Sequence, residues 1–259
     1  INQGNSGGPL VNLAGEVIGI NTWITSQTGG SIGLGFSIPI NNVKRAIEDF
    51  IEKGAVEYGW LGVQIGDPTE AVAEDMGIAE QEGAFVYHVF QDSPADKSGL
   101  LPGDYIVEID GTDVANADEL IVMVGNLPVG ERTDFTIIRK NQEISRTVNI
   151  EARLDEETLQ DPDRNKKLWP GLSVYPLTDD LREEMEIEAS VEGVIVRNVI
   201  TRTPSAIAGI AVGDVVTEIN DVNVASVSEF YRKLNAVDSK EITFSIIRED
   251  TELKIGIMR

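Results

Sequence analysis

The sequence predicts a mostly β fold with a few helices, made of a short N-terminal segment followed by a domain that occurs twice. Two observations predict it. A long stretch of sequence returns after a constant interval, and in each copy short apolar runs alternate with glycine turns and one helical pattern. The chain has 259 residues, which is enough for about two domains.

The N-terminal segment is expected to be β followed by one helix. Residues 1–40 are rich in glycine and contain short β-type runs at 16–20 and 35–38. From residue 41 the apolar side chains recur with helical spacing, which predicts a helix over 41–53. Asn41 is expected to cap its start and Gly54 its end.

The repeat is the clearest feature of the remaining chain. Residues 94–110 return as residues 204–220, an offset of 110, with Pro, two Gly, Asp, Glu and Ile at matching places. Residues 83–86 match 193–196 at the same offset, and residues 135–139 match 244–248 at an offset of 109. An offset this long indicates a duplicated domain, not a solenoid repeat.

Each copy is expected to hold short strands, a Gly-Asp turn, one helix and two final strands. The helices are predicted at 118–126 and 228–236, with Asp118 and Ser228 as N-caps. Residues 155–167 carry charges of both signs and Pro162, which suits an exposed linker. Residues 177–192 hold seven acidic side chains against Arg182, which predicts a solvated helix face and not a cation site.

Composition excludes several classes of function. Hydrophobic residues make up 41% and charged residues 25%, which is ordinary for a globular protein, and the net charge of −23 disfavours nucleic-acid and anionic-membrane binding. No aliphatic run is long enough to span a bilayer. The absence of cysteine excludes disulfides, thiolate metal sites and a cysteine nucleophile, and a single histidine excludes a multi-histidine metal site. No metal or cofactor is expected.

The motif that can carry chemistry is Gly4-Asn5-Ser6-Gly7-Gly8-Pro9-Leu10. Glycines on both sides of a serine allow a tight turn that exposes the hydroxyl and points neighbouring N–H groups at one place. Acyl transfer needs such a nucleophile and such donors. A plain glycine-rich turn explains the same spacing equally well, so the residues alone leave both interpretations open.

This heptad resembles the active-site serine motif of chymotrypsin-like serine proteases, in particular the HtrA (Deg, protease Do) family. Residues 15–22 and 31–39 resemble the strands that follow it in that family, and the two copies resemble PDZ domains. The resemblance implies the C-terminal part of a chymotrypsin-like β-barrel over 1–54, a first PDZ domain over 55–154, a linker over 155–167 and a second PDZ domain over 168–259. Residues 55–154 are called the first copy below, and residues 168–259 the second copy.

The resemblance also implies roles for single residues. Ser6 would be the catalytic nucleophile, and the backbone N–H groups of Gly4 and Ser6, with Asn5 between them, would form the oxyanion hole. The substrate would lie along a strand and a pocket that favours small aliphatic side chains, formed by Ser31, Ile32, Gly33 and Leu34.

The sequence departs from the family pattern in its triad. The histidine and aspartate precede the serine in such proteases, and only five residues precede Ser6 here. His88 lies within the first copy, at the position that Asn198 holds in the second copy, so a structural role is expected for it. The chain alone is therefore predicted to be inactive. We expect it to be the C-terminal part of a longer protease whose upstream part supplies the triad, the export signal and the trimer contacts, and we expect exposed strand edges in residues 1–54.

A PDZ domain binds a peptide C-terminus as an added strand, and backbone N–H groups of a glycine-containing loop bind the carboxylate. In the first copy this loop would be Tyr58, Gly59, Trp60, Leu61, Gly62 and Val63. In the second copy Pro170 removes one donor and Ser173 is expected to stand where the first copy has Gly62. The first copy is thus expected to bind substrate and the second to serve assembly or regulation.

The Gly-Asp turns are assigned no function, and Arg139 and Arg248 are expected to be exposed strand ends.

The function that the resemblance implies is a serine endopeptidase of the HtrA/DegP type that degrades misfolded proteins in the bacterial periplasm. Its partners would be unfolded polypeptides and peptide C-termini, and the full protein would form a homotrimer or a higher assembly. No nucleic acid, membrane span or cofactor is expected. The alternative is a non-catalytic tandem-PDZ protein that binds peptides or acts like a chaperone.

Overall fold

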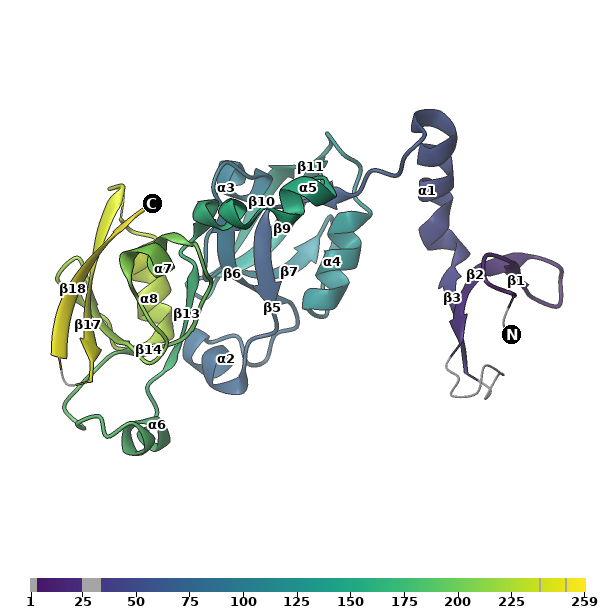
Figure 1. Ribbon diagram of the computed structural model, residues 1–259. Coiled ribbons are helices and arrows are strands. Elements are labelled where there is room, and N and C mark those ends of the chain that lie inside the picture. Colours follow the sequence, from purple (N-terminus) through teal and green to yellow (C-terminus); the bar gives the residue numbers. More distant parts are fainter. Residues whose placement is uncertain (1–3, 25–33, 238, 250) are drawn as a thin grey trace. The chain divides into compact units, whose positions relative to one another are not determined.

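The computed structural model describes residues 4–24, 34–237, 239–249 and 251–259. The chain divides into two units, an N-terminal unit of Ile1–Tyr58 and a C-terminal unit of Gly59–Arg259 (Figure 1). The predicted mostly β class with a duplicated domain is confirmed, and both copies lie in the C-terminal unit.

The N-terminal unit contains a three-stranded antiparallel sheet and one helix. The sheet order is β1 (Pro9–Val11), β2 (Val17–Ile24) and β3 (Gly35–Pro39), and α1 (Ile40–Lys53) follows directly. Gly54 ends α1 with a φ of +77° and donates its N–H to the Phe50 carbonyl, as predicted. The N-cap prediction was wrong: the cap position is Pro39, and Asn41 lies inside the helix.

The described part of the N-terminal unit has no buried hydrophobic side chain. Trp23 stacks on Phe36 at a centroid distance of 5.2 Å, yet both rings are exposed, as are Phe50 and Ile51 of α1. Among the described residues β1 and β3 pair only with β2, so the expected exposed strand edges are present. This unit therefore buries little apolar surface of its own, which limits its own stability.

The first copy is a sheet with a buried core of its own. The strand order is β10-β9-β7-β6, with β5 on the free side of β6 and β8 on β7, while β4 pairs with β11. The core lies between this sheet and α4. The elements are β4 (Gly59–Trp60), β5 (Val63–Gly66), α2 (Glu70–Met76), β6 (Ala84–Phe90), α3 (Pro94–Ser98), β7 (Tyr105–Ile109), β8 (Thr112–Asp113), α4 (Ala117–Gly125), β9 (Arg132–Arg139), β10 (Gln142–Asn149) and β11 (Glu151–Ala152).

The second copy repeats this arrangement. Its strand order is β13-β14-β15-β17-β18, with β16 on β15, so β13 and α8 correspond to β5 and α4 of the first copy. The elements are β12 (Leu168–Trp169), β13 (Leu172–Pro176), α6 (Asp179–Glu184), β14 (Val194–Val199), α7 (Pro204–Ala208), β15 (Val215–Ile219), β16 (Val222–Asn223), α8 (Val227–Leu234), β17 (Glu241–Arg248) and β18 (Thr251–Met258).

The helix starts were predicted slightly too late. Asn116 caps α4 and Ser226 caps α8, two residues before Asp118 and Ser228, and each side chain accepts the N–H of the third residue along. The solvated helix face predicted around residues 177–192 is confirmed, because α6 has no buried residue.

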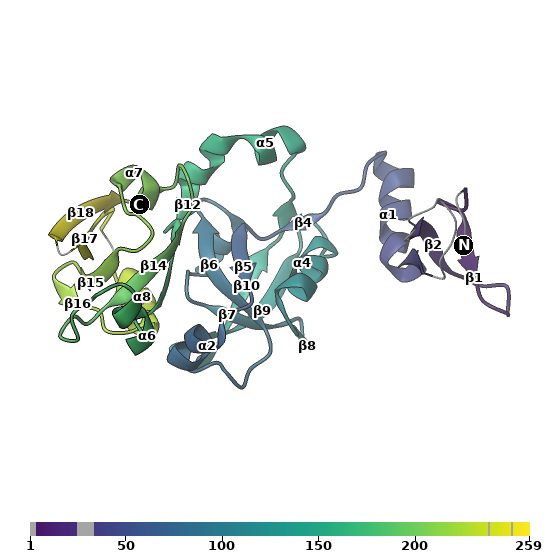
Figure 2. The same cartoon turned by 60° about the horizontal axis from the view of Figure 1, so that its bottom comes forward.

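The stretch between the copies has no buried residue in its helices, as expected of an exposed linker, but it is folded. It forms α5 (Glu156–Gln160) and the 3₁₀-helix η1 (Pro162–Lys167), after which β12 pairs with β6 of the first copy (Figure 2). The Arg164 guanidinium lies 4.3 Å from the centre of the Phe90 ring. This connection thus joins the second copy to the sheet of the first.

Each copy contains a clasp between a buried aspartate and an arginine. Arg139 is less exposed than predicted, whereas Arg248 stays partly exposed, and both are paired. In the first copy the Arg139 guanidinium binds Asp104 through two bonds of 2.6 and 2.7 Å and donates to the Gly99 carbonyl at 2.7 Å. Arg248 and Asp214 repeat this arrangement at 2.6 and 2.7 Å. The Gly-Asp turns therefore anchor the last long strand pair of each copy.

Candidate serine loop and peptide-binding sites

The serine loop is a tight glycine turn held against β2. Gly4 and Gly7 have φ angles of +99° and +81°, which other residues rarely adopt. The Gly7 N–H donates to the Asn21 carbonyl at 2.7 Å, and the Gly8 N–H donates to the Asn5 carbonyl at 3.0 Å. These bonds give the loop a defined shape with Ser6 exposed at its tip.

The Ser6 hydroxyl has a partner, but that partner is not a base. Its Oγ donates to the Thr22 carbonyl at 3.0 Å. A carbonyl oxygen does not take up the hydroxyl proton, so this bond orients the serine without activating it. Among the described residues, the N–H groups of Gly4 and Ser6 have no hydrogen-bond acceptor. Two donors beside an exposed hydroxyl are what an oxyanion hole requires.

His88, the one histidine of the chain, is buried in β6 of the first copy. Its side chain is only 3% exposed, and burial lowers its pKa from 6.5 to about 4. A neutral imidazole inside a sheet cannot reach a surface serine, so the structural role expected for His88 agrees with its position.

The predicted substrate strand is only partly visible. Leu34 is exposed and directly precedes β3, whereas Ser31, Ile32 and Gly33 lie outside the described residues. Their predicted role therefore stays a prediction.

The peptide-binding loop of the first copy is a sharp turn between β4 and β5. Gly62 at its centre has a φ of +83°, and a Cβ added there would lie 2.2 Å from the Ser93 Cβ. Its carbonyl accepts the Phe90 N–H at 2.9 Å. The N–H groups of Leu61 and Gly62 have no acceptor in the part of the chain that the structure describes. Two adjacent unpaired amides at the end of an edge strand can bind a carboxylate.

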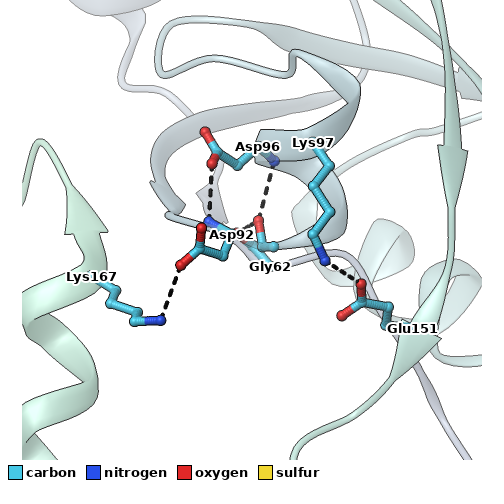
Figure 3. A network of polar contacts seen from close by, with 7 residues as sticks. Gly62, Asp92, Asp96, Lys97, Glu151 and Lys167 are labelled. Atoms are coloured by element: carbon cyan, nitrogen blue, oxygen red, sulfur yellow. Dashed lines mark hydrogen bonds and ion pairs between the residues drawn. The ribbon is translucent and has the colours of Figure 1, made fainter.

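A polar network holds this loop from the side of α3 (Figure 3). The Ser93 hydroxyl donates to the Gly62 carbonyl at 3.3 Å and accepts the Asp96 N–H at 3.2 Å. The Asp96 carboxylate accepts the Asp92 N–H at 2.9 Å, and Lys167 pairs with the Asp92 carboxylate at 3.1 Å. Sequence reasoning missed Ser93, although a serine before a proline is a typical helix start and Thr203-Pro204 repeats it.

The second copy has the same loop, but its matching residues differ from the prediction. Gly171 is the counterpart of Gly62: its φ is +82°, its added Cβ would lie 2.2 Å from Thr203, and its carbonyl accepts the Ile200 N–H. Ser173 therefore corresponds to Gln64, and the expected match of Ser173 with Gly62 was wrong. Pro170 stands at the place of Leu61, so this loop has one amide donor fewer.

The other predicted residues of the first loop divide into surface and core. Tyr58 is exposed, and Gly59 is needed because an added Cβ would lie 2.3 Å from the Val124 carbonyl. Trp60 packs beside Phe90, with ring centres 6.2 Å apart. Leu61 belongs to the core of the first copy, and Val63 is half-buried at the start of β5. Their proposed contact with a bound peptide is untested.

The described residues contain no group of three or more side chains that could hold a metal ion. In the same part of the chain, no helix is both long and apolar enough to cross a bilayer.

Comparison with protein families assigns both parts of the chain. The PDZ domain family matches residues 59–150 and 171–258, and the trypsin family matches residues 1–47. The chain is 36% identical over 257 residues to a probable periplasmic serine endoprotease DegP-like of Hahella chejuensis, covering 96% of this chain and 54% of that protein. It is 34% identical over 253 residues to the periplasmic serine endoprotease DegP of Escherichia coli K12, covering 98% and 50%. The chain thus spans about half the length of these relatives.

Solved structures give the same relationship. An HtrA-type protease AlgW with tripeptide is 39% identical, with a TM-score of 0.52, over 61% of this chain and 52% of that one. The same protease with decapeptide is 39% identical, with a TM-score of 0.50, over 60% and 48%.

Proposed function

The chain belongs to the HtrA/DegP family, and from this premise we propose that it works in a periplasmic serine endoprotease that degrades misfolded proteins. Ser6 is the nucleophile in this proposal, and the N–H groups of Gly4 and Ser6 stabilise the tetrahedral oxyanion. The observation that carries it is the loop geometry: an exposed serine stands beside two amides that have no acceptor among the described residues. The relatives named above are serine endoproteases by name.

The base that activates Ser6 is not His88, which is buried in β6. The 259-residue chain alone is therefore expected to be inactive, and the proton of Ser6 passes to a histidine supplied outside this sequence. Substrate binding falls to the first copy, where the Leu61 and Gly62 amides take the carboxylate of an exposed C-terminus and β5 takes the preceding residues as an added strand.

A fluorophosphonate probe tests the catalytic proposal, because it labels only an activated serine. We expect the protein purified from its native source to be labelled, its Ser6→Ala variant not to be labelled, and the isolated 259-residue chain not to be labelled. Labelling of the isolated chain would show that a base is already present in it. No labelling of the native protein would favour the non-catalytic tandem-PDZ alternative.

A matched pair of glycine variants tests the peptide site. A ten-residue peptide ending in valine should bind the chain, and its C-terminally amidated form should bind at least tenfold more weakly because the carboxylate is lost. Gly62→Ala should abolish binding, whereas Gly171→Ala, which meets the same steric conflict in the second copy, should leave it within about twofold. Equal losses in both variants, measured by calorimetry on folded protein, would contradict a site confined to the first copy.

A further inference from the structure

Each copy has an edge strand beside a helix where a PDZ ligand would add. In the first copy β5 pairs only with β6 among the described strands, and α4 packs on it. In the second copy β13 is the terminal strand of the sheet, and α8 packs on it in the same way. Because a PDZ ligand adds to this edge beside this helix, β13 and α8 form the corresponding site of the second copy.

Helix α2 of the first copy covers that corresponding site. It packs against both α8 and β13, and α2 lies next to α8 in both views (Figures 1 and 2). Val72 and Ala73 of α2 are buried in the same hydrophobic cluster as Leu172 and Val174 of β13 and Tyr231 of α8. The first copy thus fills the apolar side of the second site with its own side chains.

Polar contacts fix this arrangement. The Asp75 carboxylate of α2 accepts the Ser228 N–H in the first turn of α8 at 3.0 Å. At the other end of α8, the Asn235 side chain donates to the Pro102 carbonyl at 2.7 Å. Contacts at both ends of α8 orient the first copy on this helix instead of leaving a loose apolar contact.

Position 231 shows how completely the site is closed. The Tyr231 side chain is 2% exposed and lies with its ring centre 5.5 Å from that of Phe85 in the first copy. A Cβ added at Gly103 would come within 2.6 Å of the Tyr231 Cβ. Ile121, which holds the matching place on α4, is 60% exposed. The same helix position is therefore open in the first copy and covered in the second.

The sequence of α2 fits this role. Its counterpart in the second copy, α6, has no buried residue. Ala71 and Ala73 in α2 correspond to Asp180 and Arg182 in α6. Small apolar side chains let α2 approach β13 closely, whereas charged ones suit the solvent face of α6.

One part of the second edge is not filled. A cavity of about 620 Å³ lies between the copies, with Thr69, Val72 and Tyr87 on one side and Ser173 and Tyr175 of β13 on the other. A peptide could begin to pair with β13 there, but α2 stands over the rest of the edge.

We propose that α2 of the first copy is the internal ligand of the second peptide site, so that the second site accepts a peptide only after the copies separate. This proposal rests on the proposed peptide binding by PDZ domains. A peptide on β13 and the packed arrangement exclude each other, so a peptide that binds there shifts the chain towards separated copies.

Maleimide labelling tests the closure directly, because the chain has no natural cysteine. We expect a Tyr231→Cys variant to react at least tenfold more slowly than an Ile121→Cys variant. Adding Val72→Asp, which places a charge in the shared cluster, should accelerate Tyr231→Cys at least tenfold and leave Ile121→Cys within twofold. Equal rates for the two single-cysteine variants would overturn the proposal, and so would a failure of Val72→Asp to accelerate Tyr231→Cys.

A second pair of variants tests the closure independently, in case Val72→Asp prevents the chain from folding. Gly103→Ala and Gly213→Ala place alanine at φ angles of +91° and +94°, but only the former meets Tyr231. Gly103→Ala should accelerate labelling of Tyr231→Cys, and Gly213→Ala should not. The same effect in both variants would mean that backbone strain, not separation of the copies, exposes position 231, and the proposal would fail.

Peptide binding to the second site is tested last, in the Val72→Asp background in which the two copies are expected to separate. The ten-residue peptide ending in valine should slow labelling of Tyr231→Cys in the Val72→Asp background and not in its absence. If it slows Ile121→Cys but never Tyr231→Cys, the covered surface is not a peptide site and the proposal is wrong. If it slows neither, peptide binding by both copies fails, while the labelling rates without peptide still report the closure.

Discussion

The two copies share one scaffold and differ in what their surroundings do to it. Both have a glycine at the centre of the loop, a Ser or Thr cap behind it, and an Asp–Arg clasp under the Gly-Asp turn. In the first copy β5 pairs only with β6 among the described strands and Ile121 is exposed, while the second copy has its edge under α2 and Tyr231 buried. A repeated scaffold can therefore carry two different binding states, because the state depends on what packs against it.

The clasps offer the largest test of this comparison. The Arg139 side chain is 16% exposed and that of Arg248 is 36% exposed, while both aspartates are buried. Arg139→Met leaves the Asp104 charge buried without its partner, so we expect a loss of about 3–5 kcal/mol in the free energy of unfolding. Arg248→Met should cost less, because water already reaches that pair. Urea unfolding measures both, and a larger loss for Arg248→Met would reverse the ranking of the two clasps.

A smaller effect is expected from the strand position that His88 and Asn198 share. Burial lowers the pKa of His88 to about 4, so the unfolded chain takes up a proton below pH 6.5 that the folded chain refuses until about pH 4. The stability that comes from this shift is present above pH 6.5 and is lost as the pH falls towards 4, by about 3 kcal/mol in total.

The variant His88→Asn removes this titration and places in the first copy the residue that the second copy already has. The difference in unfolding free energy between the native chain and the variant should shift by that amount between pH 7.5 and pH 4, in favour of the variant at low pH. Urea midpoints at both pH values check it. A difference that is constant with pH would mean that His88 has the same pKa in the folded and in the unfolded chain.

A good part of the molecule follows from local sequence. The repeat is visible because the turn residues and strand patterns recur, and Gly54 ends α1 because a left-handed residue is needed there. The serine loop is recognisable because glycines flank Ser6, and Gly4 and Gly7 do adopt the positive φ angles that favour glycine. Such features depend on a few neighbouring residues, so the sequence alone indicates them.

The predictions that were wrong concern residues for which two sequence signals compete or whose contact partner is distant in the chain. Asp118 and Ser228 are good caps by type, but Asn116 and Ser226 are the extended residues directly before the helices and cap them instead. Arg139 looks like a strand end, and only the fold brings Asp104 beneath it. The prediction aligned the loop of the second copy two residues away from its true match, because Pro170 stands where the first copy has Leu61. The glycine that the two loops share, Gly62 or Gly171, is then hard to recognise.

The sequence by itself determined the duplicated domains, the glycine turns, the serine motif and the single histidine, since each depends on residue type and short spacing. Only the tertiary structure decided that residues 155–167 are helical, that His88 is buried, and that α2 covers β13 and α8. The physical reason is that burial arises between surfaces far apart in the chain. Val72 and Tyr231 are buried in one hydrophobic cluster, and no periodicity within either helix indicates that the two helices pack together.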